Sequence, residues 1–375
     1  MARDTTTAPV LGQRALNRAL LARQMLLERA ERSVPDAVRD LYGLQAQAPW
    51  SPYTALWTRI AGFDPHELGA MLADRRAVRI VIMRGTVHLL TADDALALRP
   101  LHAGYLARTL ATSNSQAGLA GLDLPAVAAA GRALVEEAPR PFGELGRLLA
   151  EQWSDHDPAT LAQVVRGLAP LVQVPPRAVW GRSGQVTVTT LEHWVGRPLD
   201  TAATLDAMVL RYLAVYGPAS VMDVQAWSGL TRLREVADRL GDRVVRFRNE
   251  AGREVLDLPD APRPDPDVPA PVRFLPDFDN VSLSHADRTR LVDDHVRKRL
   301  MRANGLLPGT VRVDGRVEAH WSIGRAAGTA TLTVVPFRAL TQAEATAVED
   351  EGRTLLTFAA AEADAHDVTL APPDL

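Results

Sequence analysis

The chain has 375 residues, is 47% hydrophobic and 23% charged, carries a net charge of −3 and contains no cysteine. It is long enough for two or three domains, and the missing cysteine excludes disulfides, thiolate nucleophiles and thiolate metal sites. The slightly acidic total excludes a uniformly basic nucleic-acid-binding protein. No apolar run approaches the roughly 18 residues of a membrane span, and the polar start lacks a signal segment, so we expect a cytoplasmic protein with no membrane partner.

The charges are distributed unevenly along the chain. Residues 1–110 contain 14 arginines and 10 acids, residues 284–325 contain nine basic residues and five acids, and residues 342–375 contain eight acids and one arginine. Such segregation allows one face to bind an anion although the whole chain is acidic. The basic side chains are nearly all arginine, which suits phosphate groups, although a GC-rich genome would produce the same bias.

The first region, residues 1–110, is predicted to hold several helices followed by a β-hairpin. Apolar residues recur with helical spacing between Arg14 and Arg32, and Ser33 is a suitable cap for a second helix. Two β-rich runs, 78–83 and 86–90, flank Arg84-Gly85, and a glycine between such runs favours a hairpin turn. Helices followed by a hairpin give the outline of a winged helix.

Within this region, Gln45 and Gln47 lie one small residue apart and are followed by Pro49 and Pro52. The prolines disfavour helix just before them, so we expect a helix end or a tight connection here. A strand-like pitch over 45–47 would turn both amides to one side. The simplest interpretation of this stretch, with its aromatic neighbours, is a capped corner of the core.

The order of helices followed by a strand recurs in residues 111–200, and helices followed by a hairpin recur in residues 201–258. Sequence similarity between the units is weak, so the repeat depends on element order. A proline-rich linker at 259–271 then leads into a β-rich domain, residues 259–375, with a closing helix over 341–365. We therefore predict an α+β fold of tandem winged helices and a C-terminal β-rich domain.

Two turns offer candidate DNA contacts. Asp314-Gly315 is a strong two-residue hairpin signal, and its strands carry Arg312, Arg316 and His320. The first hairpin carries Arg84, Thr86 and His88, which either form one polar face of an exposed turn or contact phosphates or bases.

The segment 277–287 contains Asp277, Asp279, His285 and Asp287, a pattern that a metal site could use. A turn whose carboxylates bond to backbone N–H groups and nearby arginines fits it better, and we predict no metal and no other cofactor. The motifs of phosphate loops, nucleophile elbows, dinucleotide sites and zinc helices are all missing from the sequence.

Several of these motifs together resemble the tandem winged-helix DNA glycosylases of the AlkZ and YcaQ type. The matching segments, which occur in order over most of the chain, are residues 44–49, 84–89, 168–176, 216–219, 227–230 and 275–280. Gln45 and Gln47 match the AlkZ branch, whereas the YcaQ branch has an aspartate at the second position.

The resemblance implies a monomeric, C-shaped enzyme that excises alkylated purines from double-stranded DNA, in some members from interstrand crosslinks, for repair or for self-resistance to an alkylating natural product. It would be associated with the nucleoid. Gln45 and Gln47 would hold the attacking water, which suffices because an N7-alkylated purine is already cationic and leaves readily. A crosslinked base cannot swing fully out of the duplex, so we expect an open, concave, basic surface.

Two other functions remain open. A non-catalytic winged-helix DNA-binding protein or transcription regulator would explain the helices and hairpins, but not the paired amides. A sequestration protein could use Trp50, Tyr53 and Trp57 as a stacking cage. Trp50 is also a candidate DNA contact.

Overall fold

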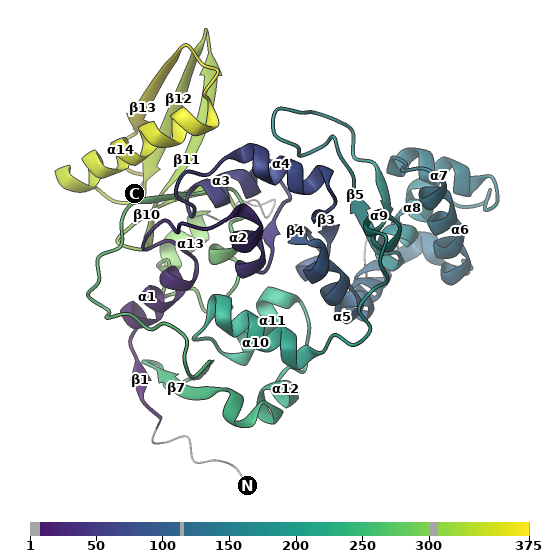
Figure 1. The fold of residues 1–375 in the computed structure, drawn as a ribbon, viewed down its shortest axis with the longest axis horizontal. Helices are drawn as coiled ribbons and strands as arrows, with labels where there is room; N and C mark the ends of the chain where they lie inside the picture. The colour runs from purple at the N-terminus through teal and green to yellow at the C-terminus, as the bar shows by residue number, and fades with distance from the viewer. Residues whose placement is uncertain (1–7, 113–115, 301–306, 375) are drawn as a thin grey trace.

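The computed structural model describes residues 8–112, 116–300 and 307–374, and in these residues helices pack around three β-sheets (Figure 1). The strand orders are β2-β4-β3-β5-β6, β1-β7-β8 and β13-β12-β11-β10-β9. The predicted α+β class is therefore confirmed.

The sheet β2-β4-β3-β5-β6 is antiparallel throughout and occupies the middle of the molecule. Its strands are β2 (Leu44–Gln45), β3 (Ala77–Val81), β4 (Val87–Thr91), β5 (Leu171–Gln173) and β6 (Val188–Thr190). The predicted hairpin is the pair β3–β4. Side chains alternate across β3: Val78 and Ile80 enter the largest core, whereas Arg79 and Val81 line a cavity on the other face.

Four helices precede or cover the start of this sheet. They are α1 (Gln13–Arg23), α2 (Val34–Asp40), α3 (Ser51–Trp57) and α4 (Pro65–Ala73). As predicted, the Ser33 side chain caps α2 by accepting from the Asp36 N–H at 3.2 Å. The first helix ends at Arg23, earlier than its sequence pattern indicates.

A helical lobe is inserted between β4 and β5. It contains α5 (Ala92–Ala111), α6 (Leu124–Glu137), α7 (Phe142–Ala150) and α8 (Pro158–Leu168), and α9 (Leu191–Val195) follows β6. The lobe has a core of its own, which meets the sheet at Leu171 and Val188. Helices α7 and α8 approach so closely that a Cβ on Gly146 would lie 2.2 Å from the carbonyl oxygen of Pro158.

The third predicted unit has the expected order of helices and hairpin. It contains α10 (Leu205–Tyr216), α11 (Val221–Ser228), α12 (Arg234–Arg239), β7 (Val245–Asn249) and β8 (Glu254–Asp257). The short strand β1 (Val10–Leu11) pairs in parallel with β7, so the beginning of the described chain completes this sheet.

The C-terminal part forms the remaining sheet, with a helix packed on it. Its elements are β9 (Arg273–Leu275), α13 (Asp294–Leu300), β10 (Gly309–Val313), β11 (Arg316–Ala326), β12 (Thr329–Pro336), α14 (Gln342–Ala359) and β13 (Ala365–Leu370). The prediction of a helix to residue 365 is wrong at its end: α14 stops at Ala359, and the chain turns back to add β13 in parallel to β12. The aliphatic residues Val368 and Leu370 pack against this core and favour the strand.

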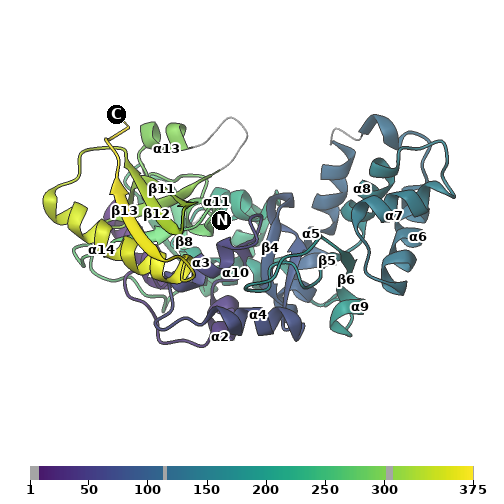
Figure 2. The same ribbon diagram turned by 90° about the horizontal axis from the view of Figure 1, so that it is seen from above.

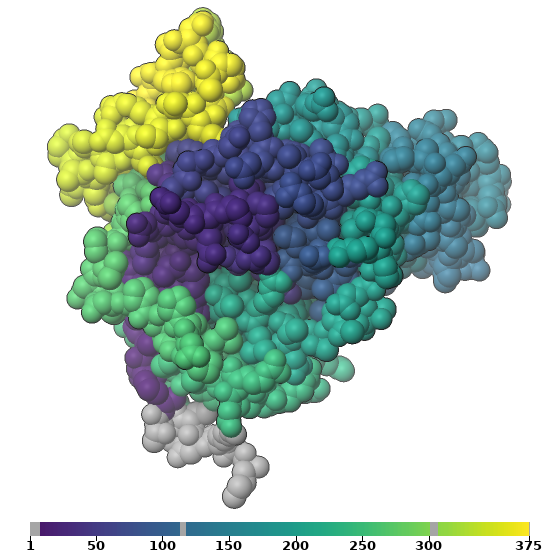
Figure 3. All heavy atoms as spheres, in the orientation of Figure 1, coloured from purple at the N-terminus to yellow at the C-terminus, as the bar shows by residue number. Residues whose placement is uncertain are grey.

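The helical lobe and the C-terminal lobe lie at opposite ends of the molecule, as the space-filling view shows (Figure 3). Seen from above, both rise to the same side of the central sheet (Figure 2). Strands β3 and β5 pair across the predicted boundary at residue 110, so the first two predicted units share one sheet. In the described residues, no helix is both long and apolar enough to cross a membrane.

Candidate active site

The Gln45–Gln47 segment begins as a strand and not as a helix end. Gly43, with φ of +100°, turns the chain into β2, and Gln45 pairs with His88 of β4. The Asn280 side chain accepts a hydrogen bond from the Gln45 N–H at 3.2 Å and donates one to the Gly43 carbonyl. Asn280 therefore fixes both ends of this short strand to the C-terminal part of the chain.

The side-chain amide of Gln45 is held by Arg84, which lies in the turn between β3 and β4. Arg84 Nη2 donates to Gln45 Oε1 at 2.7 Å, and Arg84 Nη1 donates to the Trp227 carbonyl at 2.6 Å. Because a guanidinium can only donate, this bond orients the amide with its NH₂ group away from Arg84. Gln45 is 6% exposed, and no described residue accepts from its NH₂ group.

His88 contacts Arg84 and helps to hold its guanidinium in position. Its Nδ1 lies 3.0 Å from the Thr86 carbonyl and its Nε2 lies 3.3 Å from Arg84 Nη2, so the consistent tautomer donates from Nδ1 and accepts at Nε2. Burial, and next the charge of Arg84, hold the pKa of His88 well below its usual range. Burial also lowers the pKa of Arg84 to about 10. At neutral pH, Arg84 is thus a cation and His88 is neutral.

Gln47 lies in a different environment. Strand β2 ends at Gln45, and Ala46 continues toward β4 by donating from its N–H to the Val87 carbonyl at 2.8 Å. The Val87 N–H donates to Gln47 Oε1 at 3.3 Å, and the Gln47 side chain is exposed. The strand-like pitch predicted over 45–47 therefore stops at the first amide. One glutamine is buried in a network and the other lies at a surface.

Gln47 is at the edge of a cavity of about 280 Å³, which we call the arginine pocket. It lies on the face of the central sheet that carries Arg79 and Gln173, which are cross-strand neighbours. Arg166 of α8 and Arg177 of the loop after β5 also line it, and no acid does. Arg79 is 2% exposed, and its Nη2 donates to the Ala46 carbonyl at 2.8 Å. Burial, and next the charge of Arg177, lower the pKa of Arg79 to about 10.

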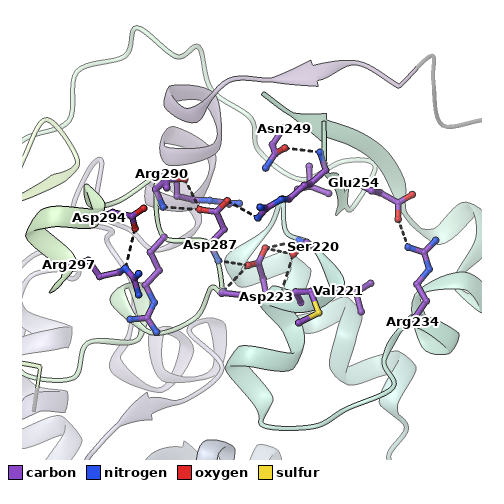
Figure 4. A pocket seen from close by; sticks show the side chains of 16 residues that line it. Ser220, Val221, Asp223, Arg234, Asn249, Glu254, Asp287, Arg290, Asp294 and Arg297 are labelled. Atoms are coloured by element: carbon purple, nitrogen blue, oxygen red, sulfur yellow. Dashed lines mark hydrogen bonds and ion pairs between the residues drawn. The ribbon is translucent and has the colours of Figure 1, made fainter. Parts of the chain in front are cut away.

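A larger cavity, of about 770 Å³, lies between α11, β8 and the segment before α13 (Figure 4). We call it the α11 groove. Three of its five arginines pair with acids: Arg234 with Asp238 and Glu254, Arg253 with Asp287, and Arg297 with Asp294. The other two, Arg288 and Arg290, donate to the backbone carbonyls of His285 and Pro218. This groove contains neither Gln45 nor Gln47.

The predicted DNA contacts of the first hairpin are mainly internal. His88 is 0% exposed, and Arg84 bonds to Gln45 and Trp227. In this structure both side chains therefore hold the Gln45 amide in position from within the protein. Thr86 is half-buried, with its hydroxyl donating to the Met83 carbonyl. Trp50 is 44% exposed and also contacts Tyr53 and Trp180. Tyr53 is 1% exposed, which leaves little of the predicted stacking cage open.

The second predicted DNA-binding turn packs against helix α1. A Cβ on Gly315 would lie 2.5 Å from Asn17 Oδ1, and Asp314 bonds to Arg14 and Arg18 of α1. Arg312 is 1% exposed and donates to the Gly315 carbonyl and to Ser282 Oγ. The turn itself is confirmed. The DNA contact of Arg312 stays a prediction, and in this structure its side chain is buried.

The other two side chains of these strands are less deeply placed. Arg316 is half-buried and pairs with Asp293 at 2.5 Å, and the His320 ring lies 5.7 Å from that of Phe337. The solvent-exposed turn of this sheet is instead the one between β11 and β12, at residues 326–329 (Figure 1).

Two aspartates of segment 277–287, Asp279 and Asp287, form bonds within the fold, as the turn interpretation predicts. Asp279 makes two hydrogen bonds of 2.9 Å to the guanidinium of Arg59, and both side chains are buried. Asp287 caps the next turn by accepting from the Thr289 N–H and hydroxyl. The arginine that bonds to Asp279 is Arg59, which is distant in the sequence and not, as predicted, nearby.

Sequence reasoning missed Asn280, Arg79 and Arg177. Asn280 follows Asp279 in a matched motif, which was a signal that it had a role. Arg79 interrupts an apolar strand, 78–83, and a charge inside such a run was a usable signal as well. Nothing in the sequence marks Arg177.

Comparisons with known proteins agree with these features. Residues 38–358 match the family model described as DNA glycosylase AlkZ-like. The chain is 25% identical over 364 residues to the interstrand DNA cross-link repair glycosylase of Streptomyces sahachiroi, covering 88% of this chain and 92% of that protein. The solved structure of the Streptomyces sahachiroi DNA glycosylase AlkZ superposes with a TM-score of 0.78 at 23% identity, covering 96% of this chain and all of that one, so the two share a fold.

Proposed function

This chain belongs to the AlkZ-like DNA glycosylase family, and we propose that it hydrolyses the N-glycosidic bond of N7-alkylated purines in double-stranded DNA. Purines that form part of an interstrand crosslink are included, because the relative from Streptomyces sahachiroi is named for crosslink repair. The observation that carries the proposal is the orientation of the Gln45 amide by Arg84, with a second, exposed amide two residues later in the sequence at Gln47.

The reaction needs little acid–base catalysis. An N7-alkylated purine carries a positive charge, so the C1′–N9 bond breaks with its electron pair moving to the base, which leaves neutral. Water then adds to the oxocarbenium-like carbon, and its proton passes to solvent because an amide is not a base at neutral pH. The catalyst has to position the water and the sugar.

We assign the positioning of this water to Gln45 and Gln47. Each Oε1 already accepts one hydrogen bond, from Arg84 or from the Val87 N–H, and a carbonyl oxygen has a second lone pair for a water hydrogen. Each NH₂ group can donate to the water oxygen or to the lesion nucleotide.

We also propose that the enzyme is monofunctional and acts as a monomer. A glycosylase that also cleaves the strand through a lysine needs an amine near C1′ to form a Schiff base. Lys298 is the only lysine of the sequence, and it lies exposed on α13, outside the contacts of the glutamine site.

The experiment is single-turnover excision from a duplex that carries one 7-methylguanine, with alkali revealing abasic sites. We expect the Gln45→Ala/Gln47→Ala variant to lose at least about 100-fold in rate, as when a transition-state hydrogen bond is removed, with DNA affinity within about threefold of the parent. Gln163→Ala, which changes an exposed glutamine of α8, is the matched control and should keep the parent rate. Full excision by the double variant would contradict the assignment.

The non-catalytic alternative is decided by the same assay. Tight binding of the lesion duplex by the parent protein, with no abasic product, would favour a DNA-binding protein without glycosylase activity.

A further inference from the structure

The arginine pocket contains more positive charge than the protein neutralises. In the described part of the chain, neither Arg79, Arg166 nor Arg177 lies within 4.0 Å of a carboxylate oxygen. The Nε and Nη1 atoms of Arg79 and the Nε atom of Arg177 are buried without a hydrogen-bond partner. The pocket therefore has three cations and several unused donors in one cavity.

Such an arrangement is costly in an isolated protein. An uncompensated buried cation carries a desolvation penalty of several kcal/mol, and neighbouring guanidinium groups repel each other. Arg79 is 2% exposed and remains charged at neutral pH. An anion that enters the cavity would remove both costs, and guanidinium groups bind phosphate oxygens with two parallel hydrogen bonds.

We propose that the arginine pocket binds the backbone phosphate next to the lesion nucleotide. This inference rests on the proposed glycosylase function, because it takes the DNA held at Gln47 as its ligand. Arg166 and Arg177, which are half-buried, contact the phosphate oxygens at the opening, and Arg79 supplies charge at the floor. The damaged base does not occupy the pocket, because an N7-alkylated purine is a cation and three arginines would repel it.

The phosphate contact is connected to the glutamines through the backbone. Arg79 donates from Nη2 to the carbonyl oxygen of Ala46, the residue between the two amides. A phosphate held by Arg166 and Arg177 compensates the charge of Arg79 and so stabilises this guanidinium where it contacts the segment that carries Gln47. The pocket thus sets the register of the strand so that C1′ of the lesion nucleotide meets the amides.

The test removes one charge from the DNA and one charge from the protein, and it measures whether the two changes affect binding independently. Duplexes with one 7-methylguanine are made with a neutral methylphosphonate at one of the phosphates on either side of the lesion, one position at a time. Dissociation constants are measured in the Gln45→Ala/Gln47→Ala background, so that excision does not consume the substrate. The Arg177→Gln substitution is then added, with Arg253→Gln of the α11 groove as the matched control.

In the Gln45→Ala/Gln47→Ala protein, which is the parent in this test, we expect one methylphosphonate position to weaken binding by about tenfold. The same position should weaken binding by about tenfold when Arg253→Gln is added, and by less than about twofold when Arg177→Gln is added. An equal penalty at every position in the parent and in Arg177→Gln would overturn the proposal. Arg166→Gln gives an independent second test if Arg177→Gln fails to fold.

Failure of the proposed function would look different. Excision by the wild-type protein is measured in parallel on the unmodified phosphate backbone. Normal excision without coupling overturns the phosphate contact alone. Coupling without excision supports the phosphate contact and overturns the proposed reaction.

Discussion

The α11 groove and the arginine pocket are both rich in arginine, and they differ in what neutralises it. In the groove, Arg253 and Arg297 pair with Asp287 and Asp294 at 3.6 and 3.3 Å. In the pocket, Arg79 and Arg177 have no acid within 4.0 Å among the described residues. Four acids line the groove beside its five arginines, whereas no acid lines the pocket beside its three, so the smaller cavity has the larger share of uncompensated positive charge. We therefore base the proposed phosphate site on charge balance and not on cavity volume.

The largest expected effect is on stability, at the floor of the α11 groove. Asp223 is 1% exposed, accepts hydrogen bonds from Ser220 and from the Ala286 N–H, and faces Arg290. Asp223→Asn removes the stronger of the two acids that act on the buried Arg290 and leaves only Asp287, so we expect the free energy of unfolding to fall by about 3–5 kcal/mol. Urea denaturation at pH 7 measures this, and a loss below about 1 kcal/mol would contradict the charge-balance account.

The same residue predicts how stability depends on pH. Burial alone would raise the pKa of Asp223, but His285, Arg290 and Ser220 outweigh it and lower this pKa. A carboxyl with a depressed pKa stabilises the fold above its unfolded pKa of about 4, and this contribution is lost as the pH falls further. Asp223→Asn should therefore flatten the stability profile below about pH 4, and an unchanged profile would contradict this.

A smaller effect, of opposite sign, is expected in the arginine pocket. Arg79→Met removes a buried cation that has no acid partner, so we expect a free energy of unfolding equal to that of the parent or up to about 2 kcal/mol higher. Single-turnover excision should fall about tenfold, while Arg79→Lys, which keeps the charge, should lose less. Destabilisation by more than about 3 kcal/mol would mean that Arg79 is mainly structural and would remove the contrast with the groove.

The smallest expected effect is that of pH on excision. Neither glutamine titrates, and burial and Arg84 keep the pKa of His88 well below its usual range. We expect the single-turnover rate on 7-methylguanine DNA to change by less than about twofold between pH 6.5 and 8.5. Because the folded protein keeps His88 neutral, the unfolded chain is the first to bind a proton at this residue as the pH falls. The free energy of unfolding therefore decreases only below a pH of about 6.5, the ordinary histidine pKa. A tenfold change per pH unit within the range would point to an ionisable catalytic group instead.

The parts of the fold that local sequence determines were predictable. The hairpin of β3 and β4, the Ser33 cap and the Asp314-Gly315 turn follow from residue types at short spacing. The packing of that last turn against α1 was not predictable, because it depends on the approach of Gly315 to Asn17, which is distant in the sequence. The long helix α5 contains Pro100 and has no strong apolar stripe, and so its pattern was weak.

The candidate site likewise has a part that the local sequence predicts and a part that depends on tertiary packing. Gln45 and Gln47 stood out because their spacing matches a family motif. The role of Arg79 was hidden, because a missing acid partner is a property of three-dimensional neighbours and cannot be read from one segment. The DNA contact of Arg84 stays a prediction. Its bonds to Gln45 and Trp227 could not be predicted, because only tertiary packing decides which way this turn faces.

The insertion of the helical lobe between β4 and β5 also bears on how the chain folds. Strand β3 cannot pair with β5 until residues 92–170 bring their two ends together, and closing so long a loop costs entropy. Because the lobe has its own core, it can fold first and present β5 close to the exit of β4. The last contacts to form would then be those between β3 and β5, so the cavity beside Gln47 would be completed late in folding.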